Sequence, residues 1–164
     1  MKRNNINFLQ CIKKLVFICC LCGVNAANSS ELDSANSYFA DGNYNKSIYY
    51  YLKHLSLNPA SSEAQLNLAA SYIHTNQHAK SLKYLDAVIN TNHNNEVALN
   101  LRASSFAVLH EWNKLILDAE SLVQINPLNK QAYMYMDIAY IALGDTDFAA
   151  QSMARYEAVS KLTK

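Results

Sequence analysis

The side chains best suited to chemistry in this sequence are its histidines and cysteines. His74 and His78 are four residues apart, but a turn is expected between them, so the two rings need not share a helix face. His54, His93 and His110 are scattered over helix and loop positions, with no HExxH motif and no paired carboxylates. We therefore expect solvated or helix-end histidines and no metal site.

All four cysteines lie near the start of the chain, at Cys11, Cys19, Cys20 and Cys22. The absence of cysteine after them excludes disulfides, a thiolate nucleophile and a zinc ribbon from the rest of the sequence. There is also no nucleophile elbow and no phosphate-binding glycine loop, and the acidic residues are spread singly. We expect a protein that is not an enzyme and that has no cofactor.

The first residues are typical of a secretory signal peptide. Four basic residues among the first fourteen precede an apolar run from Leu15 to Val24, which the small residues of "VNAA" follow. The run is too short to cross a bilayer, which takes about 20 residues. We expect residues 1–26 to be the signal peptide, with cleavage after Ala26 and Ala27 as the neighbouring choice.

An uncleaved amphipathic anchor and a buried helix are the other interpretations of this segment. Lipidation is disfavoured, because Leu21 precedes Cys22 and Cys19 precedes Cys20, where a small residue is wanted. Membrane association is expected only if the leader is retained or lipidated. The protein is therefore predicted to be exported: periplasmic in a Gram-negative bacterium, otherwise secreted.

Composition favours a single helical domain. The 164 residues include only three glycines and two prolines, too few for a turn-rich β-sandwich. The formal net charge is +1 with acids and bases interspersed, so no nucleic-acid-binding patch is expected. Loss of the leader removes four of the 14 basic residues and leaves a mildly acidic chain.

A 34-residue period runs through the sequence. The two prolines, Pro59 and Pro127, are two such periods apart. The residue directly before this position is asparagine in three successive repeats, at Asn58, Asn92 and Asn126. An independent aromatic column follows the same spacing at Tyr38, Tyr72, Phe106 and Tyr140, and small residues recur at Ala35, Ala69 and Ala103. Several columns in one register indicate an internal repeat.

Each repeat has the pattern of two antiparallel helices. Leu66, Ala69, Ala70 and Ile73 form one apolar stripe, and Leu82, Leu85, Val88 and Ile89 form the next, at steps of three and four residues. Only a few polar residues separate the stripes, so consecutive helices must be neighbours.

The repeat resembles the tetratricopeptide repeat family. The family's small, aromatic, turn and terminal positions are matched by Ala35, Tyr38, Gly42, Tyr44, Tyr51 and Pro59 in the first repeat, Leu68, Ala69 and Tyr72 in the second, Ala103, Phe106, Trp112 and Pro127 in the third, and Tyr140, Gly144 and Ala149 in the fourth. Ser34, Met136, Leu115 and Asp137 depart from the pattern. The resemblance implies an all-α, right-handed α-solenoid over 28–163, with repeats 28–61, 62–95, 96–129 and 130–163.

What the resemblance implies about function is protein recognition in a concave groove lined by the first helices. The family's groove positions correspond to Asn36, Phe39, Asn67, Ile73, His74, Asn100, Ser104, Val108, Gln131, Tyr135 and Ile138. The basic clamp by which some members hold a terminal carboxylate is missing, since Leu32, Val97 and Leu101 occupy its positions.

The sequence thus favours a non-catalytic module that binds a peptide or helix segment of another protein, as an accessory of an envelope-assembly or secretion machine. A self-assembling structural protein and a lipid-anchored or secreted adaptor are the alternatives. Because no polar capping helix follows the last repeat, we expect Met153, Tyr156 and Val159 to stay partly open to water and to support weak self-association.

The leader generates a first prediction. Because its basic, apolar and small-residue regions follow in the order of a cleaved signal, the mature protein should begin at Ala27 or one residue later. N-terminal sequencing and intact-mass measurement of the protein isolated from its source check this. A cytosolic chain that starts at Met1 would overturn the predicted export.

Overall fold

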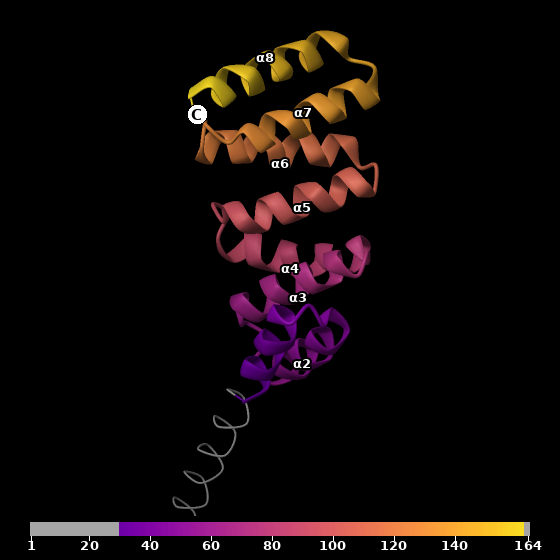
Figure 1. The fold of residues 1–164 in the computed structure, drawn as a ribbon, viewed down its shortest axis with the longest axis vertical. Helices are drawn as coiled ribbons and strands as arrows, with labels where there is room; N and C mark the ends of the chain where they lie inside the picture. The colour runs from indigo at the N-terminus through magenta and orange to yellow at the C-terminus, as the bar shows by residue number, and fades with distance from the viewer. Residues whose placement is uncertain (1–29, 163–164) are drawn as a thin grey trace, which may run out of the picture.

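The fold is a stack of paired helices, which follow one another along the long axis of the molecule (Figure 1). The computed structural model describes residues 30–162, in which no strand occurs. An N-terminal helix over 30–40 is followed by α2 (Tyr44–Leu57), α3 (Ser62–His74), α4 (His78–Thr91), α5 (Glu96–Val108), α6 (Trp112–Ile125), α7 (Lys130–Leu143) and α8 (Thr146–Leu162). The predicted all-α fold is confirmed. The predicted signal peptide and its cleavage site lie outside the described residues.

Asparagine and serine side chains begin and end these helices. Ser61, Asn95 and Asn129, spaced by the 34-residue period, each accept a hydrogen bond from the backbone amide three residues on, which satisfies one of the unpaired N–H groups of α3, α5 and α7. The asparagine column of the sequence follows the last residue of the second helices: Asn58, Asn92 and Asn126 are the C-caps of α2, α4 and α6.

The turn within each pair contains one residue with positive φ. Gly42 (φ 72°), Asn76 (58°), His110 (59°) and Gly144 (80°) occupy the same register of the four repeats. Glycine adopts this left-handed conformation freely and asparagine does so more readily than most side chains. His110 fits the same turn at a higher conformational cost. The short turn makes the two helices of each pair antiparallel neighbours.

The aromatic column packs at the contact between the two helices of each pair. Tyr38 stacks on Tyr50 with ring centroids 5.3 Å apart, and Tyr72 stacks on Tyr84 at 5.9 Å. A lysine also lies over each of the first three rings, in Lys46–Tyr38, Lys80–Tyr72 and Lys114–Phe106, at 4.9, 5.8 and 5.6 Å from the centroid. In the fourth repeat Phe148 takes the lysine's place and stacks on Tyr140 at 5.2 Å.

Small buried side chains let successive helices approach closely. Ala35, Ala69 and Ala103 are fully buried, and Asp137, which replaces alanine in the fourth repeat, is buried as well. The hydroxyls of Ser47 in α2 and Ser71 in α3 are 2.8 Å apart. Their counterparts one repeat later, Ser81 in α4 and Ser105 in α5, are 3.2 Å apart.

The first helices form the inner side of the stack. Helix α3 contacts α5, and α5 contacts α7, whereas α2, α4, α6 and α8 make no contact with one another in the described chain. Because the first helices are packed closer together than the second helices, the stack curves toward the first helices. We call the side of the stack on which the N-terminal helix, α3, α5 and α7 face away from the second helices the inner wall, and the side formed by the second helices the outer face.

The last helix differs in part from expectation. Met153 and Tyr156 are partly exposed, as predicted, but Val159 is only 6% exposed, so the expectation that it would stay open to water is wrong. Helix α8 packs closely along α7, which buries Ala149 and Ser152 as well. None of the helices in the described range is long and apolar enough to cross a membrane.

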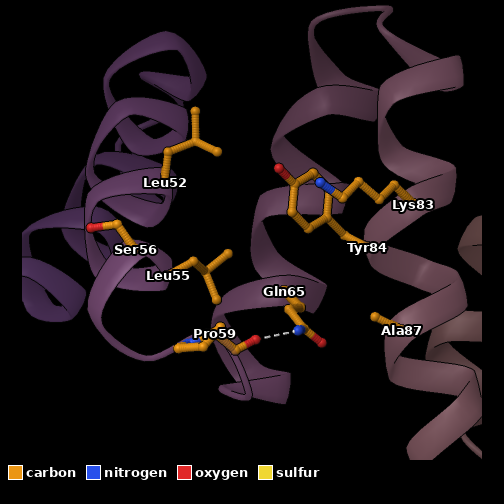
Figure 2. A pocket seen from close by; sticks show the side chains of 8 residues that line it. All are labelled: Leu52, Leu55, Ser56, Pro59, Gln65, Lys83, Tyr84 and Ala87. Atoms are coloured by element: carbon orange, nitrogen blue, oxygen red, sulfur yellow. Dashed lines mark hydrogen bonds between the residues drawn. The ribbon is translucent and has the colours of Figure 1, made fainter.

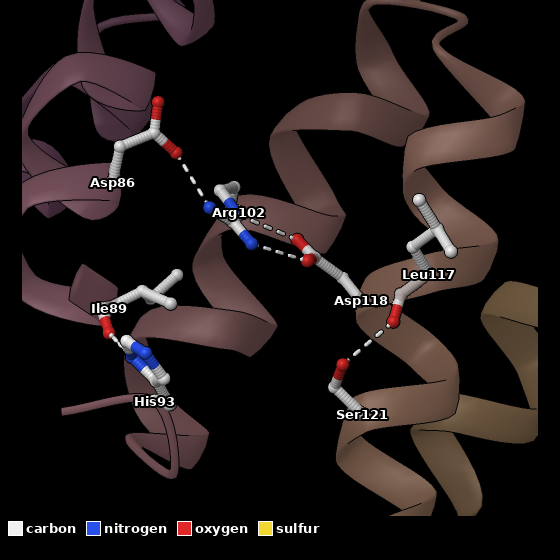
Figure 3. Close-up of polar contacts among 7 residues, drawn as sticks. All are labelled: Asp86, Ile89, His93, Arg102, Leu117, Asp118 and Ser121. Atoms are coloured by element: carbon white, nitrogen blue, oxygen red, sulfur yellow. Dashed lines mark hydrogen bonds and ion pairs between the residues drawn. The ribbon is translucent and has the colours of Figure 1, made fainter.

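An ion-pair triad joins three consecutive helices on the outer face (Figure 3). Arg102 in α5 donates through Nε and Nη2 to both oxygens of Asp118 in α6, at 2.9 and 2.7 Å, and through Nη1 to Asp86 in α4 at 2.6 Å. The Asp118 carboxyl is nearly buried, and this burial raises its pKa against the opposing effect of Arg102. The positions equivalent to Arg102 hold Leu68 and Met136 in the neighbouring repeats.

The triad generates a second prediction. Arg102→Met leaves Asp118 buried without its partner, which should lower the free energy of unfolding by about 3 kcal/mol. Adding Asp118→Ser, which copies Ser152 of the next repeat, should recover most of the loss because no uncompensated charge remains. Urea denaturation of both variants measures the difference. Equal destabilisation of the single and double variants would show that the arginine's packing, and not its charge, matters.

Candidate functional site

The residues predicted to line a groove all belong to the first helices. Asn36 and Phe39 lie on the N-terminal helix, and the other predicted positions lie on α3, α5 and α7. Their exposure differs widely: Val108 is 52% exposed and Ile138 is 39% exposed, whereas Tyr135 is 6% exposed and packs in the hydrophobic core. Ile73 also packs against that core. Tyr135 therefore supports the wall from beneath and does not form its surface.

A hydrogen-bond network holds the N-terminal end of the wall. The Tyr51 hydroxyl, from the second helix, donates to Asn36 Oδ1 at 2.6 Å. Asn67 Nδ2 donates to the same oxygen at 3.3 Å, and Asn36 Nδ2 donates to Glu63 Oε1 at 3.3 Å. The amide of Asn36, a predicted groove residue, is thus already engaged within the chain. It fixes the relative position of the N-terminal helix and α3.

The middle of the wall contains a buried acceptor without a partner. Asn100 Nδ2 donates to the backbone oxygen of Glu96 at 2.9 Å, but Asn100 Oδ1 is buried and has no hydrogen-bond partner. Leaving such a group unpaired costs on the order of 1–3 kcal/mol. Next to it, the Ser104 hydroxyl donates to Leu101 O at 2.8 Å. Because this oxygen is buried, it is not available to a ligand at the surface of the wall.

An aromatic group lies where the N-terminal helix turns into α2. Tyr44 stacks on His74 with centroids 4.2 Å apart and an interplanar angle of 5°, and Phe39 meets both rings edge-on at 5.5 and 5.9 Å. Phe39 and His74 were predicted as groove residues, whereas Tyr44 was assigned only to packing. The three rings form a half-open platform at the turn side of the wall.

The C-terminal part of the wall is aliphatic. Val97 is 59% exposed and Ile141 is 61% exposed, and Met134 and Ile138 are less exposed but still open. Gln131, at the start of α7, donates through Nε2 to the Tyr135 hydroxyl at 2.8 Å. Single exposed apolar side chains are ordinary on protein surfaces, but a row of them on one wall is a feature of interaction sites.

Several of these residues were absent from the predicted groove although the repeat register indicates them. Glu63 and Val97 precede the predicted Gln131 by two periods and one period, and Met134 follows the predicted Asn100 by one period. Each of these residues occupies the same repeat position as a predicted groove residue, so the 34-residue period alone indicates them. Their exposure, in contrast, depends on packing between repeats, which one sequence does not reveal.

The outer face carries shallow hollows between successive second helices. One hollow of about 320 Å³ lies between α2 and α4, with Leu52, Leu55 and Pro59 on one side and Tyr84 with Lys83 on the other (Figure 2). Two hollows in the same register, of about 330 and 280 Å³, contain the Arg102 triad and the Tyr140–Phe148 stack. In the described part of the chain, no three His, Cys, Asp or Glu side chains gather as metal ligands.

Part of the repeat region is similar to a known protein family. A family profile described as tetratricopeptide repeat matches residues 38–104, which run from Tyr38 of the aromatic column through α2, α3 and α4 into α5. Residues 38–104 are thus similar to the tetratricopeptide repeat family. No curated protein matches the chain.

Solved structures share the fold of this chain at low sequence identity. MamA from Desulfovibrio magneticus RS-1 superimposes with a TM-score of 0.77 and 16% identity, covering 82% of this chain and 76% of MamA. YrrB, described as a TPR protein with an unusual peptide-binding site, gives 0.78 and 14%, with 82% and 70% covered. The first TPR of Spaghetti (RPAP3), bound to the HSP90 peptide SRMEEVD, gives 0.65 and 20%, with 71% and 93% covered.

The hydrogen-bond network generates a third prediction. Burial raises the pKa of Tyr51 to about 12, whereas an unfolded tyrosine has a pKa near 10. Between these values the unfolded chain has lost a proton that the folded chain keeps, so the free energy of unfolding should fall as the pH rises from 10 to 12. Tyr51→Phe should make this fall shallower, although it lowers stability at neutral pH. Urea denaturation at several pH values from about 9 to about 12, a range that brackets the tyrosine pKa, measures how steeply the free energy of unfolding falls. The exposed Tyr49→Phe is the control. Equal slopes for wild type and Tyr51→Phe would contradict this role.

Proposed function

We propose that this chain is a non-catalytic protein-interaction module that holds a segment of another protein against its inner wall. The observation that carries the proposal is the presence of four exposed aliphatic side chains, Val97, Val108, Ile138 and Ile141, on α5 and α7. Their continued exposure to water is unfavourable, and a bound apolar segment would remove it. The arrangement is suited to binding rather than to chemistry.

The rigidity of the wall supports the proposal. Helices α3 and α5 each pack against their own second helix and against the first helix of the next repeat, and α7 packs against α8. Capped helices with a buried aromatic column present their side chains in a set geometry, so a ligand need not order the protein on binding. Two proteins of similar fold, YrrB and the first TPR of Spaghetti, are described with a peptide or a peptide-binding site, which is consistent with this use of the fold.

The cellular setting follows from the leader alone. A basic region, a short apolar run and small residues precede the repeats, so we propose that the module acts after export, as an accessory of an envelope-assembly or secretion machine. A scaffold without catalytic residues suits such a role, because it would bring an exported partner to its place without altering it.

The proposal is tested by site-specific photo-crosslinking in the source cells. A photo-reactive amino acid replaces Val108 or Ile138 on the wall, and a matched variant carries it at Leu117, which is 62% exposed on the outer face. We expect a discrete protein adduct from Val108 and Ile138 and none from Leu117, because the segment lies against the first helices. Adducts from Leu117 alone would place the binding surface on the outer face.

A further inference from the structure

The inner wall changes character along the stack. On the N-terminal helix and α3 it carries the exposed carboxylates of Asp33 and Glu63 and the amides of Asn36 and Asn67. On α5 and α7 the exposed hydrophobic side chains are those of Val97, Val108, Met134, Ile138, Ile141 and Leu143, and the exposed polar side chains Lys130 and Gln131 lie at the start of α7. A ligand that crosses all four repeats therefore meets a polar acidic half and an apolar half.

Glu31 of the N-terminal helix is paired with Lys53 of α2, whereas among the described residues no lysine or arginine forms an ion pair with Asp33 or Glu63. On the described first helices the lysines and arginines are Arg102 and Lys130 alone. Arg102 is directed to the outer face, where Asp86 and Asp118 engage it, and Lys130 is the first residue of α7, beside the apolar half. The lysines of the second helices lie mostly on the other side, three of them over the rings of the aromatic column. The potential at the N-terminal half of the wall is thus negative.

The exposed carboxylate of Glu63 on the inner wall has room for further hydrogen-bond donors. Glu63 accepts one long hydrogen bond from Asn36, at 3.3 Å, and remains exposed. Lysine and arginine side chains are donors without an acceptor function, so they complement such a surface.

We propose that the wall selects a segment with lysine or arginine at one end and aliphatic side chains at the other, the basic end lying over Asp33 and Glu63. The inference rests on the proposed function and specifies its partner. The basic end is attracted by the carboxylates and supplies donors to the wall. The aliphatic end covers Val108, Ile138 and Ile141, so charge and apolar contact together fix the direction of the segment.

The length of the segment follows from the stack. Four first helices at 8–10 Å between neighbouring axes span roughly 30 Å, which an extended chain covers with about ten residues. Synthetic peptides of about this length are therefore suitable probes. One carries lysines followed by leucine and isoleucine, a second replaces the lysines by glutamates, a third by serines, and a fourth keeps the lysines but replaces the aliphatic residues by serines.

Fluorescence anisotropy with the purified protein measures their affinities at low and high salt. We expect the basic–aliphatic peptide to bind about tenfold more tightly than the glutamate peptide at low salt, and this preference to shrink at high salt because the charges are screened. Glu63→Gln should reduce the preference severalfold, whereas Glu120→Gln, an exposed acid on the outer face, should leave it unchanged.

The aliphatic half has its own variants. Ile138→Ser and Ile141→Ser should each lower the affinity for the three peptides that keep the aliphatic end, whether the other end carries lysine, serine or glutamate. The matched outer-face variant Leu117→Ser should bind these peptides as the wild type does. Thermal melting of each variant confirms that it is folded, and Ile141 is the more exposed of the two, so its substitution perturbs packing less.

The outcomes separate this inference from the proposed function. Equal or tighter binding of the glutamate peptide, or an unchanged preference in Glu63→Gln, overturns the basic–aliphatic class. If the wall variants still weaken that binding, the interaction module itself stands. Failure of all four peptides to bind also overturns the proposed class, and the crosslinking at Val108 and Ile138 then decides whether the wall binds a protein at all.

Discussion

The close approach of neighbouring helices is the constraint on which this solenoid depends. A fully buried alanine occupies the same repeat position on the N-terminal helix, α3 and α5. Paired serine hydroxyls lie between α2 and α3 and between α4 and α5. Larger side chains at these points would push the helices apart and open the core. With the helices this close, the aromatic column fills the space beside them and the first helices come near enough to touch across repeats.

The period of the sequence was enough to predict this architecture. The column of aromatics, the asparagines at helix ends and the four turn positions all carry a local signal, because each reflects a backbone or packing requirement that recurs every 34 residues. The same logic did not separate surface from core on the first helices. Tyr135 occupies a groove position of the family but is buried, since its packing depends on the neighbouring repeats.

Interactions between residues distant in sequence were the part that periodicity missed. Asn36 is bound by partners 15 and 31 residues away, so its role in joining the N-terminal helix to α3 becomes visible only in three dimensions. Arg102 replaces an apolar residue of the repeat and is matched by two aspartates on flanking helices, each also a departure from the repeat. Such compensated departures leave no periodic signal, because the repeat pattern is broken at all three positions together.

The triad of Arg102 has a consequence for how the array could be rearranged. In a solenoid of interchangeable repeats, one unit can be deleted or exchanged, because each contacts only its neighbours in the same way. Here removal of residues 62–95 would set Leu52 in the place of Asp86, since the two occupy the same register, and Arg102 would lose one of its carboxylates. The second and third repeats therefore form a matched unit, which duplication or recombination can move only as a whole.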